Sequence, residues 1–291
     1  MSKQQVIRIP LVATVAMLFL VATSAQAQFG RGGPDPNAAN APTPRLANEK
    51  PDLSGSWRAV AGGPEGVPGG MFRRCTPFQE VCMEWTNQSQ DFTFMASSRL
   101  DMNKPFYKPE YWDRVQALDM WTNRDDPVMT CLPLGLPRQG YPVRIFQTDE
   151  DLAMFYRGGV DGGGGYPEFR MIRHDKTEHT EDDWYAFSYF GVPTVRWEGD
   201  TLVLESIGFS DETWLGRGGY FHSDQMRITE RLTRTGNEML YEMTVEDPVV
   251  LVEPWVLHPR VFQLSDNPTI IAERGSCTDT ELEHVSTQIR H

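Results

Sequence analysis

Residues 225–246 have the sequence QMRITERLTRTGNEMLYEMTVE. Residues 226–233 alternate between two sets of side chains, a period of two that is typical of a strand with one buried face. One set is Met226, Ile228, Glu230 and Leu232, and the other is Arg227, Thr229, Arg231 and Thr233. A Thr-Gly-Asn segment at 235–237 then predicts a tight turn, and strand-forming residues follow over 238–246. The stretch therefore predicts an antiparallel hairpin.

The same period of two extends over most of the chain after about residue 140. The candidate strands are 142–148, 152–157, 168–173, 184–189, 194–198, 201–207, 225–234, 238–246, 255–264 and 269–274. A second hairpin signal, Glu198-Gly199-Asp200, joins two of them. Short strands joined by short turns form a meander, and about ten of them remove their exposed edges by closing on themselves. We therefore predict an all-β fold, an antiparallel meander that closes into a lipocalin-like barrel or a strongly curled sheet.

One short helix is expected before the meander. Pro109 suits the first turn of a helix, and Tyr111, Val115, Leu118 and Trp121 follow it at helical spacing. We expect this helix to pack on the sheet or to close one end of the barrel.

The N-terminus has the three parts of a cleaved signal peptide. Lys3 and Arg8 precede an apolar run over 11–22, and a small-residue cleavage site, Ala-Gln-Ala, ends at residue 27. The apolar run is shorter than the roughly 20 residues that a membrane anchor needs. We therefore predict that residues 1–27 are removed and that the mature protein is soluble in the bacterial periplasm or secreted.

The rest of the chain divides into two parts. Residues 28–50 are rich in Gly, Pro, Ala and Asn, a composition that predicts a disordered tether. Residues 51–291 are expected to form a single β domain, with an irregular part over 51–140 and the β meander over 141–275.

The chain is acidic, with a formal net charge of −13 at pH 7. A surface of this sign repels nucleic acid and anionic lipid. We therefore expect no nucleic-acid partner, and no membrane partner after signal cleavage.

Four cysteines follow the signal peptide: Cys75, Cys82, Cys131 and Cys277. An even number in an exported chain predicts two disulfide bonds, and three pairings are possible. The short spacing favours a bond between Cys75 and Cys82, which leaves Cys131 with Cys277. Zinc is the weaker interpretation, because no C-x-x-C pair is present.

Several segments resemble known sequences. Leu53-Ser54-Gly55-Ser56-Trp57 is similar to the G-x-W element that opens the barrel of lipocalins and other calycins. A longer ordered set resembles a large family of uncharacterised exported bacterial proteins. Its segments are CLPLGLPR (131–138), WEGDTLV (197–203), GFSDETWL (208–215), His222-Ser223, Glu230-Arg231, Asp247-Pro248 and Pro254-Trp255. The resemblance implies a calycin-like β fold, and it implies no particular activity.

The connection from Gly208 to Asp224 is the predicted site, because a link of this length between short strands is uncommon unless it binds or covers something. Asp211 could orient His222, and such a pair makes a usable general base near neutral pH. We therefore predict these two as the catalytic residues. The structural alternative is that Asp211 caps a turn and His222 bonds a backbone carbonyl.

Four further residues are candidates for contacts with a substrate. Trp214 and Tyr220 are apolar groups on the same connection. Arg138 could bind a carboxylate or a sugar hydroxyl, although a packing role is the alternative. Glu230 lies in one of the segments that carry the resemblance.

No metal and no cofactor are expected. His174 and His179 lie among carboxylates that could ligate a divalent cation, but an acidic solvated loop is the commoner explanation. The glycine run 162–165 lacks the helix and lysine of a phosphate-binding loop, and no G-x-S-x-G elbow is present to support a hydrolase triad.

Two classes of function remain, and both have a small organic molecule as the partner. The first is a cofactor-independent lyase, isomerase or hydrolase that uses the His222 and Asp211 pair at a barrel mouth. The second is a non-catalytic binding or carrier protein for an apolar or aromatic ligand. The polar residues of the long connection favour the enzyme.

Overall fold

The computed structural model describes residues 35–59, 105–120, 125–127, 132–157, 167–216, 218–257 and 259–266, and the backbone of 74–75. The predicted signal peptide, the predicted disulfides, the strand 269–274 and the glycine run 162–165 lie outside the described residues. Within the described part, no helix is long and apolar enough to span a membrane.

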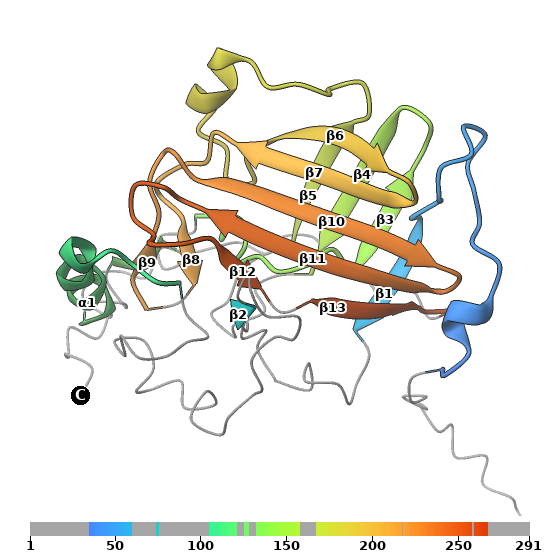
Figure 1. Ribbon diagram of the computed structural model, residues 1–291, viewed down its shortest axis with the longest axis horizontal. Coiled ribbons are helices and arrows are strands. Elements are labelled where there is room, and N and C mark those ends of the chain that lie inside the picture. The colour runs from blue at the N-terminus through green and yellow to red at the C-terminus, as the bar shows by residue number, and fades with distance from the viewer. Residues whose placement is uncertain are drawn as a thin grey trace, which may run out of the picture. The chain divides into compact units, whose positions relative to one another are not determined.

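The described residues form a nearly closed, antiparallel, barrel-like sheet (Figure 1). The strand order is β5-β4-β3-β1-β13-β11-β10-β7-β6; β12 also pairs with β11, and β2 pairs with β12. The strands of this sheet are β1 (Gly55–Ala59), β2 (Arg74–Cys75), β3 (Arg144–Gln147), β4 (Asp151–Tyr156), β5 (Glu168–Arg173), β6 (Val192–Glu198), β7 (Thr201–Ile207), β10 (Arg227–Thr235), β11 (Glu238–Glu246), β12 (Trp255–Leu257) and β13 (Arg260–Leu264). A second sheet pairs β8 (Trp214–Gly216) with β9 (Tyr220–Phe221). The prediction of an all-β fold with one short helix is confirmed.

The hairpin of β10 and β11 has the register that its sequence predicts. Arg227 pairs with Glu246 at the open end, and Thr235 pairs with Glu238 beside the turn. In both strands buried side chains alternate with more exposed ones, because one face of the pleat meets the core. Gly236 in the turn has φ +60°, a conformation that glycine adopts without steric cost.

The segment 35–50, which we expected to be part of a disordered tether, is hydrogen-bonded to this hairpin and its neighbour β13. Asn237 N donates to Ala38 O at 2.8 Å, and Gly236 N donates to Thr43 Oγ1 at 2.8 Å. A Cβ at Gly236 would lie 2.6 Å from the carbonyl oxygen of Ala41. The composition is typical of a linker, but these backbone groups have partners on the sheet.

The predicted helix is present as α1 (Trp112–Met120), preceded by the 3-10 turn η3 (Pro109–Tyr111). Pro109 occupies the first turn, as expected. Trp112 and Val115 are buried, and α1 lies next to β9 (Figure 1). Trp121 lies outside the described residues.

Two strand predictions differ from the structure. The strand expected over 255–264 is divided into β12 and β13. Residues 184–189 were expected to form a strand, but 181–185 form a 3-10 helix, η5 (Glu181–Tyr185). Thr180 caps it, because its side chain accepts from the backbone N–H of Asp183 while the Asp183 side chain accepts from the N–H of Thr180. This capping box begins a helical turn and outweighs the strand preference of the aromatic residues that follow.

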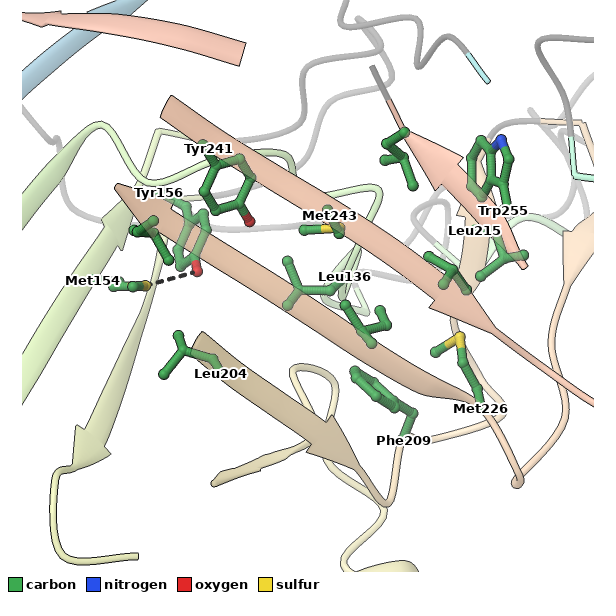
Figure 2. Packing of buried hydrophobic residues seen from close by; sticks show 14 of the residues in the cluster. Leu136, Met154, Tyr156, Leu204, Phe209, Leu215, Met226, Tyr241, Met243 and Trp255 are labelled. Carbon is green, nitrogen blue, oxygen red and sulfur yellow. Dashed lines mark hydrogen bonds between the residues drawn. The ribbon is translucent and has the colours of Figure 1, made fainter. Parts of the chain in front are cut away.

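Side chains fill the inner face of the sheet. Figure 2 shows residues from β4, β7, β11 and the loops packed against one another. They include Leu136, Met154, Tyr156, Leu204, Phe209, Met226, Tyr241 and Met243. The inner side of the described sheet is therefore a packed core, and a site for a ligand has to be sought at its ends.

Candidate functional site

An open pocket lies at the end of the sheet where β10 begins and β11 ends. Its volume is about 480 Å³, which is within the range of small-molecule sites. Its walls are η5, these two strands and the loop 247–254. The described residues that line it are Trp184, Gln225, Arg227, Glu246, Asp247, Pro248, Leu251, Val252, Glu253 and Pro254.

Asp247 shapes the loop wall of the pocket. Its carboxylate accepts hydrogen bonds from Ser223 N at 2.6 Å and Ser223 Oγ at 2.8 Å. It also accepts from the backbone N–H groups of Val249 and Val250, at 3.1 and 3.2 Å. Four donors compensate a carboxylate that is only 2% exposed, and they tie the loop to the end of the connection 208–224.

Another wall is built on η5. The guanidinium carbon of Arg227 lies 5.9 Å from the centre of the Trp184 ring, a cation–π contact. The same guanidinium forms an ion pair with Glu205 on β7. Trp184 is therefore held over the sheet by a cation from β10, whose charge is matched by an anion from β7.

The pocket carries negative charge that is not fully neutralised. Glu246 is exposed, and its carboxylate has no hydrogen-bond or ion-pair partner among the described residues. Arg227 is the one cation among the described lining residues, and Glu205 already neutralises it. Glu246 therefore gives the wall a negative potential that favours a positively charged molecule.

His179 lies behind this wall. Its Nδ1 is 3.7 Å from an oxygen of Asp183, and its Nε2 is 3.8 Å from an oxygen of Glu205. Both nitrogens are shielded from solvent and have no hydrogen-bond partner in the described structure. Burial lowers the pKa of His179, although both carboxylates act in the opposite direction. Among the described residues, no group of three or more His, Cys, Asp or Glu side chains is arranged to hold a metal.

The predicted catalytic pair is not hydrogen-bonded. His222 is 3% exposed, with Nε2 2.7 Å from Thr213 Oγ1 and Nδ1 2.8 Å from the carbonyl oxygen of Ser223. Asp211 is exposed and bonds neither ring nitrogen. Burial lowers the pKa of His222, and the Ser223 carbonyl and the charges of Asp247 and Asp211 act in the opposite direction. The contact with a backbone carbonyl is the one that the structural alternative expected, and a catalytic role for either residue stays a prediction.

Three of the four candidate substrate-binding residues lie in the core. Trp214 and Tyr220 are 4% and 2% exposed. Arg138 donates two hydrogen bonds to the carboxylate of Asp126, at 2.7 and 2.8 Å, and both side chains are buried. None of the three lines the pocket.

The fourth candidate, Glu230, belongs to a buried polar cluster on the inner face of the sheet. It forms an ion pair with Arg170 of β5 at 2.6 Å and accepts a hydrogen bond from the Tyr241 hydroxyl at 2.8 Å. Arg170 also donates to the hydroxyl oxygens of Tyr156 and Ser206. Glu230 and Ser206 are completely buried, so the cluster is sealed from the pocket.

Sequence reasoning missed Trp184, Arg227 and Glu246 as site residues. Arg227 and Glu246 lie opposite each other at the open end of the hairpin, and the register alone could have placed them together. Trp184 carried no such signal, because its segment was predicted as a strand.

No protein-family model, no curated protein and no solved structure matches the chain. The resemblance to a family of exported bacterial proteins therefore stays a prediction. The residues of the pocket are the basis on which a function can be inferred.

Proposed function

We propose that this protein is exported to the periplasm or the medium and binds a small organic molecule without changing it chemically. The ligand has an apolar or aromatic body and a positive charge. The observation that carries the proposal is the pocket of about 480 Å³, which is lined by Trp184 and by Glu246, whose carboxylate has no partner among the described residues.

The apolar half of the pocket supports a ligand with a hydrophobic body. Val252 is 61% exposed there, and Pro248, Leu251 and Pro254 extend the same surface. An apolar ligand group that covers these side chains removes hydrocarbon from water, which stabilises the complex. The Trp184 ring offers a flat surface on which an aromatic group or an ammonium can lie.

The charge of the pocket supports a cation. Exposed Glu246 would repel an anionic ligand, and Arg227, the one cation among the described lining residues, is already paired with Glu205. The ammonium of Lys108 donates to the carbonyl oxygen of Pro248. The net charge of −13 for the whole chain adds a long-range attraction for cations.

The acid–base enzyme is less well supported than the binding protein. Its catalytic pair required Asp211 to orient His222, and the ring of His222 is instead held by Thr213 and a backbone carbonyl. Among the described residues that line the pocket, none is a histidine.

Three small aromatic probes of different charge test this proposal: benzyltrimethylammonium, benzyl alcohol and benzoate. Calorimetric titration of the mature protein should show the cation binding more tightly than the alcohol, and benzoate not binding. Trp184→Ala should weaken cation binding by about tenfold, and Glu246→Gln by about two- to fivefold.

Glu242→Gln is the matched control, because it removes the same charge from the same strand at a residue that does not line the pocket. It should leave the affinity unchanged. Tighter binding of benzoate, or equal losses in the Glu246 and Glu242 variants, would contradict the proposed site.

A further inference from the structure

A row of alternating charges lies directly behind the pocket wall. Lys176 pairs with Asp183 at 3.0 Å, and Glu205 pairs with Arg227. These four groups carry two positive and two negative charges, so the row is neutral as long as His179 between the two pairs is neutral.

His179 is placed between the two carboxylates of the row. Its Nδ1 is 3.7 Å from a carboxylate oxygen of Asp183 and its Nε2 is 3.8 Å from one of Glu205, just beyond hydrogen-bonding distance. The backbone of Glu205 also acts on the ring and, like the two carboxylates, favours its protonated form. A neutral imidazole has one N–H and cannot satisfy both acceptors. An imidazolium has two and could bond both after shifts of less than about 1 Å.

Both carboxylates belong to elements that form the pocket wall. Asp183 precedes Trp184 in η5, and Glu205 holds the guanidinium of Arg227. A change in the charge of His179 therefore changes the electrostatic potential at Trp184 and Arg227, two of the residues that line the pocket. The other charged groups on its own segment, Glu178, Glu181 and Asp182, are exposed to solvent.

We propose that His179 is a proton-responsive residue that lowers the affinity of the pocket for cations when it becomes protonated. Protonation adds one positive charge behind the wall, so the row gains a net charge of the same sign as the ligand. It also gives Glu205 a second cationic partner, which weakens its neutralisation of Arg227. This inference rests on the proposed function, because it concerns regulation of the same pocket.

The direction of the pH dependence follows from linkage. Burial lowers the pKa of His179 from its ordinary value, so the ring is neutral and the pocket is in its high-affinity state at pH 7. Affinity falls as the pH approaches this lowered pKa, which lies below the ordinary histidine value of about 6.5. By reciprocity, a bound cation must lower the pKa of His179 further.

The test compares benzyltrimethylammonium affinity at about pH 7.5 and about pH 5, a range in which carboxylates of ordinary pKa stay mostly ionised. We expect the affinity of the mature protein to fall by about three- to tenfold at the lower pH. His179→Gln should abolish this fall. His174→Gln is the matched control, since it removes a histidine from the same segment with no ion pair to Asp183 or Glu205, and it should behave as the wild type.

A second measurement keeps the inference testable if His179→Gln does not fold. The NMR titration of the His179 ring in the wild-type protein should shift to lower pH when benzyltrimethylammonium is added. A pH dependence that persists in His179→Gln, or a ring titration that the probe leaves unchanged, overturns the role of His179 alone. Absence of binding at both pH values overturns the proposed function, and the role of His179 with it.

Discussion

The hydroxyl oxygen of Thr213 lies 2.7 Å from Nε2 of His222, inside the core and away from the pocket. The other ring nitrogen faces the carbonyl oxygen of Ser223, which can only accept, so Nδ1 carries the proton of the neutral ring. The single hydroxyl hydrogen of Thr213 is then shared between Nε2 and the carbonyl oxygen of Ser210, to which the hydroxyl also donates at 3.1 Å. The ring of His222 therefore links two parts of the connection 208–224, the one at Thr213 and the one at Ser223.

Replacing Thr213 with valine should destabilise the protein. Valine keeps the shape of the side chain but leaves Nε2 of His222 buried without a donor, at a cost of about 1–3 kcal/mol in the free energy of unfolding. Urea denaturation measures this cost. Thr213→Ser keeps the hydroxyl and removes a methyl group, so NMR of the His222 ring should show the Nδ1–H form retained in that variant. An unchanged free energy of unfolding for Thr213→Val would show that the bond contributes nothing.

The stability of the protein should decrease as the pH falls below about 6.5. Burial lowers the pKa of His222 in the folded state, so the unfolded chain takes up a proton at a higher pH than the folded protein does. The stabilisation is complete above the unfolded pKa and is lost as the pH falls toward the folded one. Urea midpoints measured between about pH 8 and about pH 5 check this, and His222→Gln should make the dependence shallower. His179, with a pKa lowered in the same direction, accounts for part of the remaining slope.

The buried pair of Arg170 and Glu230 should be costly to break from one side. Glu230→Gln leaves the guanidinium buried without its countercharge, and we expect a loss of about 3–5 kcal/mol in the free energy of unfolding. The exposed pair of Glu198 and Arg231, at 2.8 Å, is the control, and Glu198→Gln should cost less than about 1 kcal/mol. The double variant Arg170→Met with Glu230→Gln should lose less than the two single changes combined. Additive losses would show that the two side chains do not stabilise each other.

Two turn glycines allow the contact with the N-terminal segment to be measured. Gly199 and Gly236 have φ values of +61° and +60°, so alanine is strained at both by about 1 kcal/mol. At Gly199 an added Cβ meets nothing within 4 Å, whereas at Gly236 it meets Ala38 O at 2.7 Å and Ala41 O at 2.6 Å. Thermal unfolding should therefore show a larger loss for Gly236→Ala than for Gly199→Ala. Equal losses would mean that residues 38–41 move away at no cost.

The sequence contains most of what determines the fold. The strict alternation over 226–233 and the Thr-Gly-Asn turn predict β10 and β11, because side-chain period and turn geometry are local properties. The helix after Pro109 follows from the same kind of local signal. The strand predicted over 184–189 is wrong because two local preferences compete there. The capping box of Thr180 and Asp183 favours a helical turn, and it outweighs the strand preference of the aromatic residues.

The site was not predictable in the same way. Trp184, Arg227 and Val252 meet at the pocket although they are far apart in the chain, and no motif connects them. The pair of Asp211 and His222 was inferred from proximity in sequence within one connection. Proximity does not fix direction, and the ring of His222 turns toward Thr213 and its own neighbour's carbonyl group instead.

The position of β1 in the strand order has a consequence for the time course of folding. β1 pairs with β3 on one side and with β13 on the other, where Trp57 lies opposite Leu264. Synthesis begins at the N-terminus, so β1 is made long before its partner β13. Contacts of such large sequence separation form slowly, because the loop they close must lose its freedom first. The two halves of the sheet can therefore join only after β13 has been synthesised.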